Sequence, residues 1–397
     1  MEMRFRQNKA LPVKVALLLL MVVLLVTAGG LSGLGCIRGL QAIGWSGGAI
    51  VDNTLFVGSK EGRLVAINLA EGGRQWSEAL KMSGQGAGLF GCGTPAAGGG
   101  CGGGPTGVAI YGTPAVAGGL VYIAGYNGKI YAFDSSTLQI RRIYPREGNL
   151  QPIVGGTAAA QDTVYVGAAD TKESWKLYAL DAATGNERWQ FGTGDRVWST
   201  PVVSGETVYF GSFDYKLYAL DAESGNKLWE FKAEGAIGAT PLVHNGTVYI
   251  GSFDRHLYAV DAASGTLKWQ FMGENWFWAT PLVYEGVIYA PCLDGRVYAL
   301  DAESGLKLDE YDLGSPVSSS PVLVDSTIVL ASQAGGIYAI DTSSGQKRQL
   351  VDIEAEVYGP LSTSQGVVYI HTQDLKIHAV DASSGAELPT ISLKSGE

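Results

Sequence analysis

The chain has 397 residues, of which 56 are glycine, 46% are hydrophobic and only 17% are charged. Glycine is about twice as frequent as in average proteins, while aliphatic and tyrosine residues are plentiful, which excludes a disordered or a collagen-like chain. The formal net charge is −10. Because an acidic globule repels phosphate backbones, this charge disfavours nucleic acid as a partner.

The N-terminus has the pattern of an export or anchor segment. Positions 1–14 hold four basic residues and one acidic residue, a charge of +3 that leaves −13 for the rest of the chain. The apolar run Val15–Ala28 follows, and no charge occurs before Arg38. This order is typical of a signal peptide, or of a membrane anchor whose N-terminus stays in the cytoplasm. We expect a signal or anchor helix within residues 1–36, a short linker at 37–43, and a cell-membrane-anchored body on the periplasmic or extracellular side.

Cys36 is a candidate lipidation site. The stretch from Leu31 to Cys36 resembles a bacterial lipobox, with glycine before the cysteine, although Gly33 stands where that motif usually has leucine. An uncleaved anchor helix and a cleaved, released protein are the two alternatives to a lipidated Cys36. All three interpretations export the body of the chain.

A repeat of 40 residues dominates the rest of the sequence. Three units, which begin at Thr200, Thr240 and Thr280, align without gaps and read Thr-Pro, an apolar run, glycine, a second apolar run with tyrosine, then Tyr-Ala, Asp-Ala and Ser-Gly. The aspartate after the Tyr-Ala pair marks the period, and Asn68 takes its place in the first unit. It recurs at Asp134, Asp181, Asp221, Asp261, Asp301, Asp341 and Asp381. Eight units follow from this series.

Each unit contains four short apolar or aromatic runs separated by turn residues, which predicts four strands. In one unit Asn245-Gly246 marks a tight hairpin between two of these runs. Four strands repeated eight times predict an all-β fold, an eight-bladed β-propeller of four-stranded antiparallel blades, over residues 44–397. A glycine-rich insertion at 81–107 interrupts the series between the first two units.

The repeat resembles that of a known family. Leu257 to Ala262, followed by Ser264-Gly265 and Trp269, is similar to the repeat of pyrroloquinoline-quinone (PQQ) propellers. That family includes quinoprotein alcohol dehydrogenases and the non-enzymatic outer-membrane assembly lipoprotein BamB, so the resemblance implies the fold and leaves the function open. It also implies that Trp76, Trp189, Trp229 and Trp269 pack one blade against the next.

Residues that recur in every unit are expected to serve the fold, and function is expected where the repeat breaks. The recurrent aspartates would be spread around a ring, one in each blade, which argues against a catalytic cluster. The connections between units differ from one another, and a propeller gathers these connections on one face. The candidate partner- or ligand-binding residues there are Asp195, Arg196, Trp198, Glu274, Trp276, Trp278, Glu356 and Tyr358.

These aromatic residues have three interpretations. Tryptophan beside arginine and carboxylates is typical of a protein-binding hot spot. The same rings are suited to stacking on a flat ligand such as PQQ, or they close the mouth of the central channel. Cys92 and Cys101 in the insertion are candidates for a disulfide in an exported protein.

No catalytic or metal-ligating motif is found, so we predict no catalytic residues, metal site or cofactor. The expected function is a non-catalytic, membrane-tethered scaffold that binds an envelope or membrane protein, as BamB does. A PQQ-dependent dehydrogenase, with PQQ and calcium, is the alternative, although the chain lacks the adjacent cysteines of those enzymes. An extracellular sensor of a small ligand or sugar is the second alternative.

Overall fold

The computed structural model describes residues 46–59, 61–80, 108–169, 171 and 174–394. The expected anchor at 1–36, the linker at 37–43 and the insertion at 81–107 lie outside these residues, as do Cys36, Cys92 and Cys101. The described part of the chain contains strands and turns and no helix, so no helix in it could cross a membrane.

Within the described residues, thirty-two strands form eight antiparallel four-stranded sheets, and each sheet takes its four strands consecutively from the chain. Blades 1 and 2 consist of β1 (Ala49–Val51), β2 (Thr54–Gly58), β3 (Leu64–Asn68), β4 (Arg74–Trp76), β5 (Ala115–Ala117), β6 (Leu120–Gly125), β7 (Lys129–Asp134) and β8 (Ile140–Tyr144). Blades 3 and 4 consist of β9 (Thr157–Ala160), β10 (Thr163–Ala169), β11 (Trp175–Asp181), β12 (Glu187–Thr193), β13 (Val202–Ser204), β14 (Thr207–Gly211), β15 (Lys216–Asp221) and β16 (Lys227–Lys232).

Blades 5 and 6 consist of β17 (Leu242–His244), β18 (Thr247–Gly251), β19 (His256–Asp261), β20 (Leu267–Met272), β21 (Leu282–Tyr284), β22 (Val287–Pro291), β23 (Arg296–Asp301) and β24 (Lys307–Asp312). Blades 7 and 8 consist of β25 (Val322–Val324), β26 (Thr327–Ala331), β27 (Gly336–Asp341), β28 (Lys347–Asp352), β29 (Ser362–Ser364), β30 (Val367–His371), β31 (Lys376–Asp381) and β32 (Glu387–Ser392). The predicted eight-bladed propeller is therefore confirmed.

The burial of each strand follows from its place in the blade. In blade 5 every residue of β18 is buried, because this strand has a neighbouring blade on each of its two faces. The outer strand β20 exposes most of its residues and buries Trp269. Asn245 and Gly246 take φ of 45° and 69° between β17 and β18, which confirms the predicted hairpin turn.

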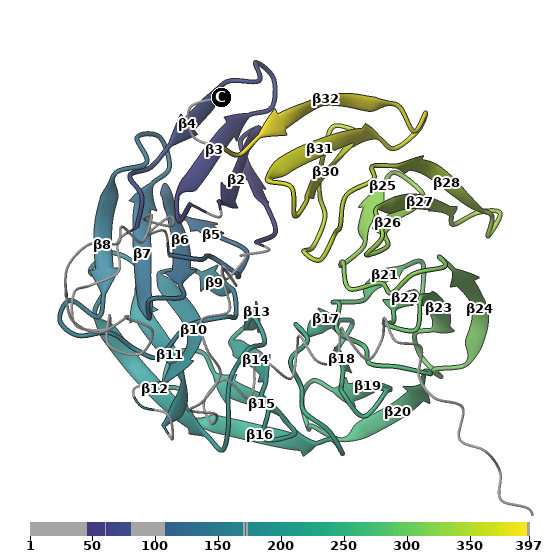
Figure 1. Cartoon of the computed structure of the whole chain (residues 1–397). Coiled ribbons are helices and arrows are strands. Elements are labelled where there is room, and N and C mark those ends of the chain that lie inside the picture. The colour runs from purple at the N-terminus through teal and green to yellow at the C-terminus, as the bar shows by residue number, and fades with distance from the viewer. Residues whose placement is uncertain (1–45, 60, 81–107, 170, 172–173, 395–397) are drawn as a thin grey trace, which may run out of the picture. The chain divides into compact units, whose positions relative to one another are not determined.

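The core is divided among the junctions between blades. Eight clusters of buried apolar residues are present, and each joins two neighbouring blades. The last cluster joins blade 8 to blade 1, through Ile377 and Leu393 on one side and Leu55 and Val65 on the other. The chain thus runs once around a ring (Figure 1). Since no sheet shares strands from both ends of the chain, side-chain packing and single hydrogen bonds close the ring.

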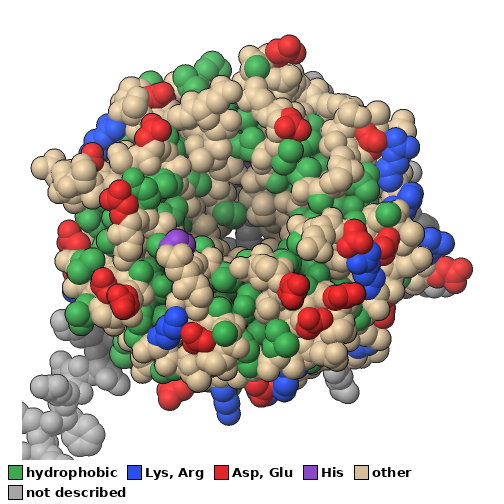
Figure 2. All heavy atoms as spheres, turned by 180° about the vertical axis from the view of Figure 1, so that it is seen from behind, with side chains coloured by type: hydrophobic (Ala, Val, Ile, Leu, Met, Phe, Trp, Pro, Cys, Tyr) green, Lys and Arg blue, Asp and Glu red, His purple; other side chains and the backbone are tan. Residues whose placement is uncertain are grey.

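The blades give the ring two unlike faces. One face, called the loop face here, carries the connections between blades and the loops between the second and third strands of each blade. The other, the hairpin face, carries the two remaining turns of each blade. Figure 2 shows one face of the propeller, hollowed at its centre, with hydrophobic side chains inside and most charged side chains towards the rim.

Candidate functional site

The recurrent aspartates hold turns on the hairpin face, as predicted. The Asp261 carboxylate accepts hydrogen bonds from the backbone N–H and the hydroxyl of Ser264, at 2.9 and 2.8 Å. The same pair of bonds recurs at Asp221, Asp301 and Asp381. Bonds from serine side chains and backbone lower the pKa of Asp381 to about 2. Each carboxylate is therefore engaged within its own turn, and no acidic catalytic cluster forms from them.

Three of the four recurrent tryptophans join one blade to the next. The indole N–H of Trp229 donates to the Ala262 carbonyl at 3.0 Å, and a Cβ on Gly265 would lie 2.7 Å from the indole ring. Trp189 and Trp269 make the equivalent bonds at 3.1 Å. The prediction is confirmed for these three residues.

Trp76 differs from the other three in the blade against which it packs. It packs against the apolar cluster shared with blade 8, the preceding blade in the ring. Trp76 pairs with Val65, whereas Trp229 and Trp269, which we call docking tryptophans together with Trp189, pair with the alanine of their third strand. A β-bulge follows that alanine in their blades and is absent between β3 and β4. Because successive side chains of a strand point to opposite faces, this one-residue difference in register reverses its direction.

The loop face is tied together by backbone hydrogen bonds between its two kinds of loop. Phe213 N–H donates to the Arg196 carbonyl at 2.8 Å, and Ile237 N–H donates to the Ser212 carbonyl at 3.0 Å. Each loop between second and third strands is thus held by the connection before its blade and by the connection after it. The face is therefore a rigid frame on which the variable side chains are placed.

Three of the predicted site residues come together in one cluster. Trp198, Trp276 and Trp278 combine with Phe213 and Phe253 into what we call the aromatic cluster. Phe253 stacks on Trp276 and on Trp278, with centroid distances of 4.5 and 5.5 Å, and Phe213 contacts Trp198 at 4.6 Å and Phe253 at 5.5 Å. All five residues are half-buried, so the cluster keeps part of its surface open to solvent.

Sequence reasoning missed Phe213, Phe253 and Gly238. The two phenylalanines stand in Gly-Ser-Phe-Asp segments that look like part of the repeat, but only blades 4 and 5 carry phenylalanine there. Gly238 occupies the position of Trp198 and Trp278 in its own connection, and a Cβ on it would lie 3.3 Å from both phenylalanine rings. A glycine between two connections that carry tryptophan at the same position was the signal that could have revealed the cluster.

The charged candidates on the same connections are engaged separately. The Arg196 guanidinium lies over the Trp175 ring, 5.6 Å from its centroid. The backbone N–H of Arg196 donates to the Asp195 carboxylate at 2.7 Å. Glu274 forms an ion pair with Arg296 at 3.0 Å. These groups border the aromatic cluster, since they lie in the connections into blades 4 and 6.

Glu356 and Tyr358 belong to another sector of the loop face, the connection into blade 8. The Tyr358 hydroxyl donates to the Glu356 carboxylate at 3.3 Å. Burial, and then the Glu356 charge, raise the pKa of Tyr358 to about 12. In the neighbouring connection Ser318 replaces the aromatic residue, and it accepts a hydrogen bond from Gln333 at 3.0 Å. The loop face is thus aromatic over blades 4–6 and polar over blades 7 and 8.

The described residues do not fit a site for PQQ and calcium. Among them no three histidine, cysteine, aspartate or glutamate side chains gather closely enough to hold a metal ion. Phe253 already fills the space between the stacked faces of Trp276 and Trp278. Cys292 is a buried thiol that donates to the Asn275 carbonyl at 3.2 Å, and burial raises its pKa to about 12, so it is no nucleophile.

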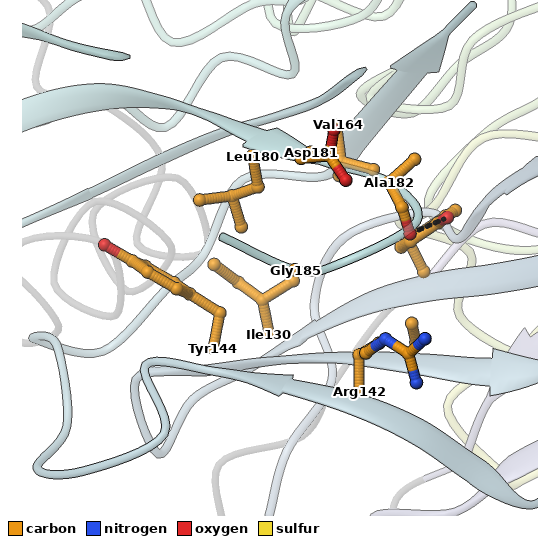
Figure 3. A pocket seen from close by; sticks show the side chains of 10 residues that line it. Ile130, Arg142, Tyr144, Val164, Leu180, Asp181, Ala182 and Gly185 are labelled. Carbon is orange, nitrogen blue, oxygen red and sulfur yellow. Dashed lines mark hydrogen bonds between the residues drawn. The ribbon is translucent and has the colours of Figure 1, made fainter. Parts of the chain in front are cut away.

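A small hollow of about 20 Å³ lies between blades 2 and 3 and is large enough for about one water molecule (Figure 3). It is lined by Ile130, Tyr144 and Leu180, with Arg142 on one side. Arg142 pairs with Ala132, the position at which blades 3 to 5 carry the docking tryptophan. The hollow is therefore the space left by a missing indole, and it is too small for a cofactor.

The chain was compared with known proteins. No match was found among curated proteins. In structure the chain is similar to BamB from Moraxella catarrhalis, with a TM-score of 0.65 and 17% identity over 87% of this chain and 97% of that one. A computationally designed protein, Ika8, gives 0.66 and 16% over 86% and 97%. Quinohemoprotein alcohol dehydrogenase from Comamonas testosteroni gives 0.62 and 14% over 88% and 73%.

These structural likenesses establish a common fold, since all three identities are low. A family model described as outer membrane protein assembly factor BamB matches residues 38–213, 144–236 and 173–390. Together these matches span all eight blades. The chain therefore belongs to the BamB family of PQQ-like β-propellers.

Proposed function

We propose that this protein is a non-catalytic scaffold that binds an envelope or membrane protein through its loop face. The N-terminal segment would hold the propeller at a membrane, on the extracytoplasmic side. By analogy with the family description, the scaffold would serve the assembly of envelope proteins.

The aromatic cluster is the observation that carries this proposal. Trp198, Trp276 and Trp278 are large, half-buried and held by stacking, and they border arginine and carboxylate groups. Tryptophan and arginine are the residue types that dominate binding energy at protein interfaces, and side chains fixed before binding lose little entropy on association.

Crosslinking in membranes tests the proposal. Membranes that contain the tagged full chain are crosslinked, and the products are identified by mass spectrometry. A specific protein partner should be recovered with the natural chain and lost with Trp276→Ala or Arg196→Ala. Leu308→Ala is the matched control, because Leu308 is 58% exposed on an outer strand away from the loop face.

Two results would contradict the scaffold. The first is that no specific partner is recovered, or that a Trp276→Ala variant recovers the partner as well as the natural chain does. In the latter case the variant must also unfold at the same temperature as the natural chain. The second is enzymatic activity, seen as bound-quinone absorbance or dye-linked alcohol oxidation when purified protein is supplied with PQQ and calcium. We expect neither signal.

A further inference from the structure

The loop face carries an excess of negative charge that ion pairs do not neutralise. Asp352 at the end of β28, and Glu354 and Glu356 in the connection into blade 8, are all exposed. Glu234, in the connection into blade 5, is exposed as well. None of these four carboxylates forms an ion pair with another described residue.

The cations of the same face offset only part of this charge. Arg296 and Lys376 are paired with Glu274 and Asp374, at 3.0 and 2.8 Å. Arg196 lies over an indole ring, and Arg255 and Lys232, at the end of β16, are exposed. Glu234 lies in the connection that carries Gly238 beside the two phenylalanine rings, whereas the acidic connection into blade 8 lies in another sector of the same face. The loop face therefore carries a field that attracts positively charged groups, and such a field acts over about 10 Å at 0.1 M salt.

Two exposed side chains beside the aromatic cluster are held in a strained backbone conformation. Tyr215 and Arg255 take φ of 73° and 75°, in the loops that carry Phe213 and Phe253. Blades 2 and 6 have Gly128 and Gly295 at this position, with φ of 72° and 93°, and blade 8 has Leu375 with φ of 67°. A side chain in this region costs about 1 kcal/mol or more, and strained residues concentrate at functional sites. Tyr215 is 46% exposed, so its ring gains little from packing.

We propose that the loop face binds a positively charged, extended segment of a protein partner. An apolar side chain of this segment packs on the aromatic cluster next to Tyr215, where a lysine or arginine meets Glu234. Further basic side chains meet Glu354 and Glu356 where the extended segment crosses the loop face to the connection into blade 8. The faces of Trp198 and Trp276 favour cations through their ring quadrupoles. This inference rests on the proposed scaffold function, and it specifies the chemistry of the partner.

Synthetic peptides test the charge of the bound segment. Three twelve-residue peptides share the same phenylalanine and serine positions and carry lysine, glutamate or glutamine elsewhere. Binding to the full chain is followed by tryptophan fluorescence and calorimetry at several salt concentrations. The lysine peptide should bind saturably, with an affinity that falls as salt rises, and the glutamate peptide should not bind.

Matched variants locate the site. Trp276→Ala should weaken binding of the lysine peptide by about tenfold or more, as expected for a hot-spot aromatic residue. The double variant Glu354→Lys/Glu356→Lys should weaken binding and flatten its salt dependence. Glu223→Lys/Glu303→Lys makes the same charge change in exposed turns of the hairpin face and should leave binding unchanged.

Several outcomes would overturn the inference. These are equal binding of the glutamine or glutamate peptide, no binding of any peptide, or lysine-peptide binding that ignores both loop-face variants. The two proposals remain distinguishable. If crosslinking recovers a partner that depends on Trp276 while charge reversal at Glu354 and Glu356 has no effect, the scaffold stands and the basic segment is wrong.

Discussion

In blades 3 to 6 and in blade 8, one backbone carbonyl accepts hydrogen bonds from side chains of the preceding blade. The Ala222 carbonyl accepts bonds from the Trp189 indole and the Tyr165 hydroxyl, at 3.1 and 3.0 Å, both from the preceding blade. In blade 7 the place of the tryptophan is taken by Arg348, which donates to the equivalent Ala382 carbonyl at 3.2 Å. The tryptophans could be predicted from the sequence because they recur at one position of the repeat, whereas Arg348 departs from that repeat and gave no signal.

Replacement of Arg142 by tryptophan should stabilise the propeller. The new indole would fill the hollow between blades 2 and 3, pack against Gly185 and donate to the Ala182 carbonyl, as Trp229 does in its own junction. We expect Arg142→Trp to raise the free energy of unfolding by about 1 kcal/mol, a typical gain for such a substitution. Denaturant unfolding measures it. Trp229→Arg is the reverse change and should destabilise; an Arg142→Trp variant less stable than the natural chain would show that the hollow cannot accept the ring.

The second strand of each blade ends at a position where the next element comes very close. A Cβ on Gly211 would lie 2.2 Å from Ile237, and one on Gly251 would lie 2.3 Å from the Phe277 carbonyl oxygen. Blade 8 has His371 at this position, and its Nδ1 lies 2.8 Å from the Ser46 carbonyl of the first blade. The histidine therefore lies at the junction that closes the ring. Every other blade has a small residue or proline at the equivalent position of its second strand.

The closing junction should weaken as the solution becomes acidic. Burial lowers the pKa of His371, while Asp374, the charged group that acts on it, opposes this shift. The unfolded chain then binds more protons than the folded one below about pH 6.5, so stability is complete above that pH and falls below it. We expect up to about 2 kcal/mol to be lost between pH 7 and pH 5. Denaturant unfolding at a series of pH values measures this loss.

Two histidine variants identify the group responsible. His371→Asn keeps a donor near the Ser46 carbonyl and cannot titrate, so its stability should depend less on pH. His244→Asn changes an exposed histidine in a hairpin turn and should leave the pH dependence as it is. The interpretation is wrong if the two variants lose stability equally between pH 7 and pH 5.

At the scale of the whole molecule, the sequence was sufficient for the architecture and insufficient for the binding face. The period of the aspartates yields the number of blades, because each aspartate closes one turn of its own blade. The aromatic cluster joins side chains from loops 15 to 80 residues apart, such as Trp198 and Trp278, and depends on the small Gly238 between them. The repeat predicts the tryptophans that join neighbouring blades, but contacts among side chains of different loops, such as the aromatic cluster, are not encoded in any local pattern of the sequence.

Closure without a shared strand has a consequence for chain connectivity. Since an apolar cluster joins the blades at every junction and no described sheet combines strands of two blades, the place where the chain begins should matter little to the folded ring. A circular permutant would begin at Gly235 and end at Glu234. Its linker would connect β32 to β1 through nine residues, the spacing found between β16 and β17. We expect it to fold and to melt within a few degrees of the natural order, as circular dichroism would show. Failure to fold would instead mean that the contact between Ser46 and His371 requires the natural chain ends, so that the ring can start only at blade 1.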